Sequence, residues 1–67
     1  MTAAQFEQLE EEAAVEVLRW RFDVLMRAGF DMEQAAALAA NVEIDLHRAA
    51  ELLARGCPPD TALRILV

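Results

Sequence analysis

The sequence has one cysteine, two glycines and two prolines, and it contains no lysine. One cysteine excludes an internal disulfide, and a lone thiol is typical of proteins in a reducing compartment. No apolar run approaches the roughly 18 residues that a membrane-spanning helix requires. The acidic N-terminus lacks the basic segment that begins a signal peptide. We therefore predict a cytoplasmic protein. Arginine is used without lysine and alanine is abundant, a composition that suggests a bacterial source.

Residues for metal or covalent chemistry are also scarce. His47 and Cys57 are the only soft metal ligands, whereas a structural zinc site needs four ligands, usually in closely spaced pairs. A Cys–His catalytic pair would also need an orienting third group and a cleft, for which so short a chain has little room. We therefore expect no metal, no cofactor and no enzymatic activity. His47 is interpreted as a surface histidine, and Cys57 as a half-buried thiol.

Charge is distributed unevenly along the chain, whose net charge is −6. Residues 1–16 carry five glutamates and no basic residue, whereas residues 17–67 carry seven acidic residues and six arginines, which sum to −1. This balance disfavours nucleic acid as a partner, because phosphate binding depends on clustered positive charge. The run from Glu10 to Glu12 is interpreted as a solvated helix face rather than a cation site.

Neither glycine nor proline interrupts residues 1–28, and helix-forming residues dominate them. The sequence therefore predicts one long helix from about Ala3 to Ala28. Gly29 ends it, because glycine adopts the left-handed C-terminal cap without strain. Residues 1–15 are then an acidic N-terminal extension of this first helix.

The pair Gly29-Phe30 marks the junction to a second helix. Asp31 is a good N-cap, and Gln34 follows it at the capping-box spacing. Phe30 precedes the cap, where its ring is placed to pack on Ala35 as a hydrophobic staple.

The remaining helix ends follow from the same residue types. The second helix should end near Ala40, and the third should begin at Asp45 or, less favourably, at Asn41. Gly56 ends the third helix, and Pro59 suits the first turn of a short fourth helix. No segment has the alternating pattern of a strand, so the predicted fold class is all-α. The many alanines allow helix backbones to approach closely, so that a small unit can bury its leucines: Leu38, Leu46, Leu52 and Leu53.

The stretch AGFDMEQAAALAANVEIDLHRAAELL resembles the ubiquitin-associated (UBA) domain pattern of a glycine–aromatic loop and two short helices. The matching residues are Gly29 and Phe30 in the loop, Ala37 and Leu38 in the second helix, and Asp45, Ala49 and Leu53 in the third. Ala28 stands in place of the family's loop methionine, and Asp45 in place of its usual asparagine. The resemblance covers about residues 16–55 and leaves 56–67 as a short C-terminal helix.

The resemblance implies a three-helix packing and a partner-binding surface formed by the loop and the outer part of the third helix. In this sequence that surface would contain Gly29, Phe30, His47 and Glu51. The N-terminal domain of elongation factor Ts is similar in form, and this likeness implies a partner connected with translation. The C-terminal stretch RGCPPDTALRIL also resembles small actinobacterial proteins, a likeness that implies no function.

The long first helix carries two apolar faces rather than one. The first face should pack on the second and third helices; it consists of Val15, Leu18, Phe22, Leu25 and Met26. The second face has the spacing of a helix pair; it consists of Phe6, Leu9, Ala13, Val17, Trp20 and Val24. Its cover is a second copy, a different protein or the fourth helix. We expect an antiparallel homodimer in which one copy's acidic arm covers Trp20 and meets Arg21 of the other.

The sequence thus predicts a small helical protein–protein interaction module without catalysis. The alternative is a small DNA-binding regulator of helix-turn-helix type, in which the second and third helices direct Arg48 and Arg55 toward DNA.

Overall fold

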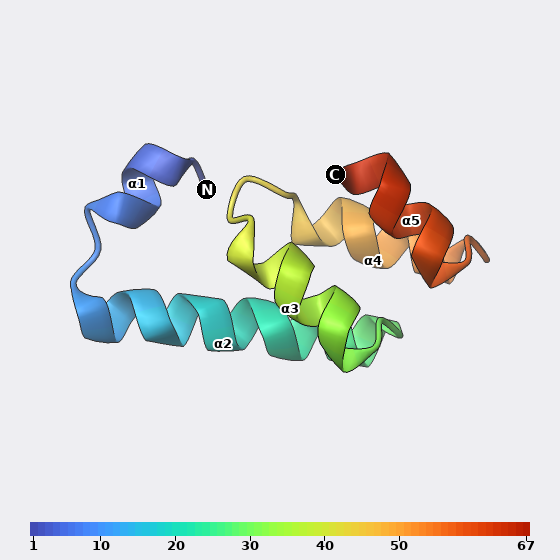
Figure 1. Ribbon diagram of the computed structural model, residues 1–67, viewed down its shortest axis with the longest axis horizontal. Helices are drawn as coiled ribbons and strands as arrows, with labels where there is room; N and C mark the ends of the chain where they lie inside the picture. The colour runs from blue at the N-terminus through green and yellow to red at the C-terminus, as the bar shows by residue number, and fades with distance from the viewer.

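The computed structural model describes the whole chain, residues 1–67, and contains only helices (Figure 1). They are α1 (Ala3–Glu7), α2 (Glu11–Ala28), α3 (Met32–Ala40), α4 (Leu46–Ala54) and α5 (Pro59–Leu66). The predicted all-α class is therefore confirmed. None of these helices is both long enough and apolar enough to span a membrane.

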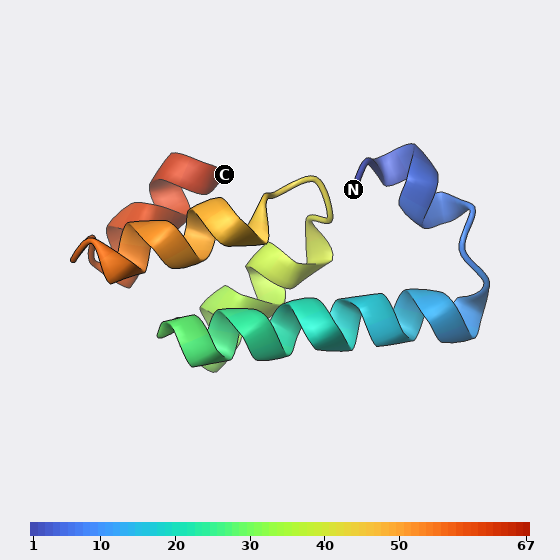
Figure 2. The ribbon, with the colours of Figure 1, turned by 180° about the vertical axis from the view of Figure 1, so that it is seen from behind.

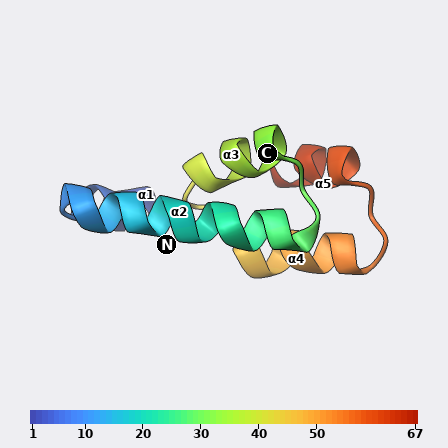
Figure 3. The ribbon, with the colours of Figure 1, turned by 90° about the horizontal axis from the view of Figure 1, so that it is seen from below.

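The long helix α2 is the base on which the other helices are arranged. α3 and α4 both pack on α2, and α5 packs on α3 and α4. Figure 3 shows α3 and α4 on the two sides of the C-terminal half of α2, whose N-terminal half extends beyond them. The molecule is elongated as a result, with extents of 36 × 18 × 16 Å.

The expected single helix from Ala3 to Ala28 is wrong at Gln8–Glu10, where the chain reverses and separates α1 from α2. α1 folds back beside the N-terminal half of α2, toward the α3–α4 loop (Figure 2). A capping box between Thr2 and Gln5 begins α1 locally. Helix propensity is a weak preference that tertiary contacts override, and it did not reveal this break.

The predicted ends of the other helices are confirmed. Gly29 has φ +120° and its N–H donates to the last carbonyls of α2. Asp31 and Gln34 form the expected reciprocal capping box at the start of α3. Asp45 caps α4 by accepting from the N–H of His47 at 2.9 Å.

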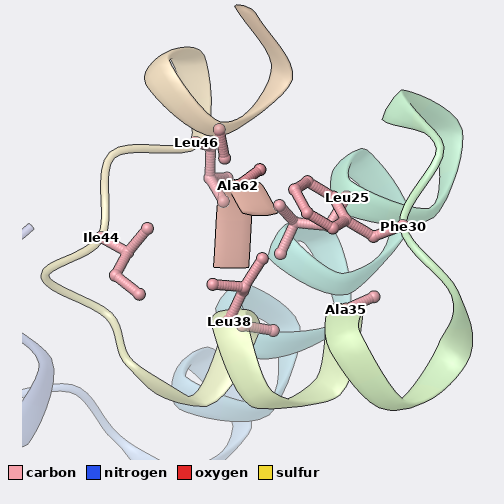
Figure 4. Close-up of a cluster of buried hydrophobic side chains, with 9 residues drawn as sticks. Leu25, Phe30, Ala35, Leu38, Ile44, Leu46 and Ala62 are labelled. Atoms are coloured by element: carbon pink, nitrogen blue, oxygen red, sulfur yellow. The ribbon is translucent and has the colours of Figure 1, made fainter. Parts of the chain in front are cut away.

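The hydrophobic core lies where the four helices α2 to α5 meet, as Figure 4 shows. Leu25 and Leu38 are its largest fully buried side chains. Ala62 of α5 points between them and Leu46, and its lack of bulk lets α5 approach closely. The predicted leucines Leu52 and Leu53 pack against this core but remain partly exposed.

The first apolar face of the predicted long helix is only partly buried. Leu25 is fully buried and Phe22 packs against the core, whereas Val15 and Met26 stay exposed. The alanines divide in the same way by helix face; those of the core are Ala35, Ala39, Ala49 and Ala62.

Candidate functional site

An open apolar groove of about 550 Å³ lies between α2 and α4. Trp20 and Val24 lie one turn apart on α2, and Leu46, Ala50 and Ala54 repeat every four residues along α4. We call this the Trp20 groove; its lining is completed by two polar residues, His47 and Glu51. Trp20 is 62% exposed, an unusual degree for the largest apolar side chain of a small protein.

A second hollow of about 540 Å³ adjoins the Trp20 groove and shares Trp20, Leu46 and His47 with it. The chain returning through α1 places Met1 in its wall. The other residues of this hollow come from α2 and from the α3–α4 loop: Val17, Arg21, Glu43, Ile44 and Asp45.

The charged side chains that line these two hollows are acidic, with one exception. Glu43, Asp45 and Glu51 contribute carboxylates, and Arg21 contributes the single guanidinium. The positive charge of Arg21 is directed inward to backbone carbonyls, whereas Arg55 pairs with Glu51, so the carboxylates without an ion pair are Glu43 and Asp45 of the second hollow. The site therefore combines an apolar floor with an acidic edge.

Arg21 is a buried arginine, 5% exposed, and no carboxylate pairs with it. Its Nη2 donates to the carbonyl oxygens of Asn41 and Ile44, both at 2.9 Å, and at 3.4 Å to that of Leu38. Its Nε donates to the carbonyl oxygen of Ala39 at 3.1 Å. Burial lowers the pKa of Arg21 below its ordinary value. The partial negative charge at the C-terminus of α3 is what offsets the cost of burying this cation.

The guanidinium connects three elements. It belongs to a residue of α2, and it donates hydrogen bonds to carbonyl oxygens at the C-terminus of α3 and in the α3–α4 loop. The loop carries Val42 and Ile44 into the interior, where both are buried. Leu46, the first residue of α4, begins the wall of the Trp20 groove. Arg21 therefore positions the wall of the Trp20 groove, although its side chain does not line that groove.

The structure brings together only half of the residues expected at the UBA-like surface. His47 and Glu51 are exposed and line the Trp20 groove, as a binding role would require. Phe30 is 2% exposed and belongs to the core, so its ring offers no surface to a partner. Gly29 lies near Leu53 of α4 and is absent from the groove. The glycine–aromatic pair is thus a helix junction and a core anchor in this chain.

The expected self-association face is divided between two helices. Phe6 is on α1 and Leu9 is in the connection, both half-buried; Ala13, Val17, Trp20 and Val24 remain together on α2. Val24 packs against the core, so Trp20 is the most exposed member of the face. The expected contact between Arg21 and the acidic arm of another copy is excluded in this conformation, because Arg21 is buried.

The other candidate residues are placed as follows. Arg48 on α4 and Arg55 just after its end are both exposed, and Arg55 forms an ion pair with Glu51. Cys57 is half-buried, as expected, with its thiol 3.6 Å from the carbonyl oxygen of Pro58. The structure contains no group of three or more histidine, cysteine or acidic residues arranged to hold a metal ion.

Sequence reasoning missed the burial of Arg21 and the apolar residues of α4 that line the groove. The one indication was that Arg21 falls between two apolar faces of a helix, a position where an exposed charge is uncommon. Neither a protein-family model, a curated protein nor a solved structure matches the chain. What bears on function is therefore the geometry and charge of the groove itself.

Proposed function

We propose that the chain is a non-enzymatic protein–protein interaction module whose Trp20 groove binds an amphipathic helix of another protein. The observation that carries this proposal is the large exposed indole beside an apolar groove. Exposed apolar surface rimmed by polar residues marks interaction sites, and tryptophan is enriched among the residues that dominate binding energy. Covering Trp20 would contribute about 1.5–3 kcal/mol.

The dimensions of the groove favour a helix as its occupant. Its two walls are helices, and Ala50 and Ala54 leave room for a third helix backbone to approach. A helix in a groove inserts apolar side chains at positions three and four apart. Such a stripe would lie along Val24 and Leu46 and end against Trp20.

The charge of the groove indicates which kind of helix it binds. Glu51 lines the groove, Glu43 and Asp45 line the hollow beside it, and the chain as a whole carries −6. Complementary charge guides encounter and suppresses partners of the wrong sign. The proposed ligand is therefore a helix with an apolar stripe flanked by lysine or arginine. The lone cysteine supports a reducing compartment such as the cytoplasm as the setting.

Self-association is the second candidate. The accessible surface is 4747 Å², whereas a compact protein of this mass exposes roughly 4,200 Å². The excess accessible surface arises because the molecule is elongated and α2 extends past the core. A second copy could cover the extended part of α2. Two copies joined through this face would set their carboxylates near one another, which favours the basic helix over the homodimer.

The UBA-type packing of α2, α3 and α4 is also a proposal. The order of the three helices, the Gly29 junction and the Asp45 cap support it. The binding surface differs from the expected one, because Phe30 is internal and Trp20 takes its place as the exposed aromatic residue. The DNA-binding alternative has less support, since Arg55 is paired with Glu51 and the neighbouring surface is acidic.

The test is an NMR titration of the isotope-labelled chain with a synthetic amphipathic helix of leucine and lysine. We expect the largest shift changes at the amides of α2 and α4 around Trp20, and small changes on α3. The same titration with a helix of leucine and glutamate should show weaker binding. Shift changes centred on α3 and α5, or equal affinity for the two peptides, would contradict the proposal.

A further inference from the structure

The short helix α1 is held to the rest of the molecule weakly. None of its residues is buried. Its one hydrogen bond to a distant residue runs from the N–H of Ala3 to Oε1 of Glu43 at 3.2 Å, and that bond is exposed. Phe6 is only half-buried. A segment with so few buried contacts opens at low free-energy cost, well below that of unfolding the core.

Nothing in the covalent sequence requires the break between α1 and α2. Residues 1–28 contain neither glycine nor proline, and the sequence alone predicts a continuous helix there. The side chain of Glu10, the N-cap of α2, makes no capping hydrogen bond. A helix that begins without a side-chain cap has lost one of the features that fix its start. The break at Gln8–Glu10 is therefore maintained by the weak docking of α1.

If α1 and α2 formed one straight helix, the apolar face that contains Trp20 would become longer. Phe6 and Leu9 would fall on the same face as Val17 and Trp20, because their spacing of three and four residues follows the helical repeat. That face would be about two turns longer, and Met1 would leave the hollow that it lines beside Trp20. Glu10 would lie beside the added length, which extends the acidic edge.

We propose, on the basis of the function given above, that Gln8–Glu10 is a hinge controlled by binding. In the free chain α1 folds back and closes the Met1 end of the hollow beside the Trp20 groove. When the basic amphipathic helix binds, α1 leaves Glu43 and continues α2 as one helix. Phe6 and Leu9 then join the bound surface.

The first experiment uses two substitutions at one position. Glu10 has φ −64°, which proline adopts without strain. Glu10→Pro therefore permits the folded-back form and blocks the straight helix, in which proline would lack a backbone donor. Glu10→Ala removes the same carboxylate and permits both forms. We expect Glu10→Pro to bind the leucine–lysine helix about tenfold more weakly than Glu10→Ala, with equal thermal stability of the two free chains.

The second experiment reports the position of α1 directly. A nitroxide on Ala3→Cys, in a Cys57→Ala background, quenches Trp20, the only tryptophan, at short range. Folded back, residue 3 is bonded to Glu43, which lines the same hollow as Trp20. In a straight helix the two positions are about 26 Å apart. We expect strong quenching in the free chain relative to a diamagnetic label, and its loss on adding the peptide.

A third comparison needs no ligand. Glu43→Gln keeps an oxygen that accepts from Ala3, whereas Glu43→Ala removes it. We expect helical carbon shifts at residues 8–10, and reduced quenching, in Glu43→Ala but not in Glu43→Gln. Quenching that persists with bound peptide, together with equal affinities of Glu10→Pro and Glu10→Ala, would overturn the hinge and leave the groove proposal standing. Absence of peptide binding would refute the groove, and the Glu43 pair then decides whether the hinge exists.

Discussion

The guanidinium of Arg21 donates a buried hydrogen bond to the carbonyl oxygen of Ile44 at 2.9 Å, and both residues line the hollow beside the Trp20 groove. This one contact connects the middle of α2 to the loop that leads into α4. The same Nη2 also reaches the carbonyl oxygen of Asn41 at 2.9 Å. A cation thus replaces the apolar residue that the interior of a helical protein ordinarily contains. Its value to the fold is that it satisfies several backbone acceptors at once.

Replacing Arg21 should be costly, because it leaves buried carbonyl oxygens without donors. We expect Arg21→Met to lower the free energy of unfolding by about 2–4 kcal/mol and to speed amide exchange in residues 41–45. The matched control is Arg19→Met, since Arg19 is exposed on the same helix and should change stability by less than about 0.5 kcal/mol. Urea unfolding followed by circular dichroism measures both. Equal midpoints for the two variants would show that Arg21 does not hold the loop.

The contribution of Arg21 should not depend on pH in the neutral range. Burial lowers its pKa below the ordinary value, so the folded chain binds this proton less tightly than the unfolded chain does. Stability therefore rises with pH only in the alkaline window between the folded pKa and the ordinary value. From about pH 5 to 9 the guanidinium is protonated in both states. The stability difference between wild type and Arg21→Met should stay constant there, and a difference that changes by pH 9 would contradict this assignment.

Gly29 should resist substitution for reasons of backbone conformation alone. Its φ is +120°, and an added Cβ would meet Leu53 Cδ1 at 3.5 Å, an ordinary contact. We expect Gly29→Ala to cost about 1–2 kcal/mol and Gly29→Val more, because side chains disfavour positive φ. Gly29→Asn should lose less than Gly29→Ala, since asparagine tolerates positive φ better. Thermal melting distinguishes them, and three unchanged melting temperatures would exclude strain at this junction.

The oligomeric state separates the two candidate functions. If the Trp20 groove serves a basic helix, the purified chain should sediment as a monomer of 7.5 kDa at high micromolar concentration. Trp20→Glu should then have the same mass and fold. A dimeric mass that Trp20→Glu halves would instead assign the face to a second copy.

The features that sequence reasoning predicted correctly are local ones. The ends of α3, α4 and α5 follow from residues such as Asp31 and Pro59, whose effects act within one turn. The all-α class follows from the same helix-forming composition.

The features that it missed depend on distant parts of the chain. The break at Gln8–Glu10 accompanies docking of Ala3 near Glu43, a contact across 40 residues. The inward direction of Arg21 depends on where α3 ends, and the pattern of α2 indicates it only through the position of Arg21 between two apolar faces. Part of the groove was foreseen, because Trp20 belongs to an apolar face and the resemblance to the UBA pattern implied His47 and Glu51. That the faces of α2 and α4 meet is decided by tertiary packing, which the local sequence pattern does not reveal.

The most direct test of the Trp20 groove compares one substitution inside it with its counterpart outside. Ala54 is exposed within the groove, and Ala37 is exposed on α3 outside it. Ala54→Arg and Ala37→Arg add the same charge and the same bulk to the protein. Their affinities for the leucine–lysine helix are read from the emission of the single tryptophan, Trp20. The groove proposal predicts that Ala54→Arg binds about tenfold or more weakly than Ala37→Arg, and equal affinities of the two folded variants would contradict it.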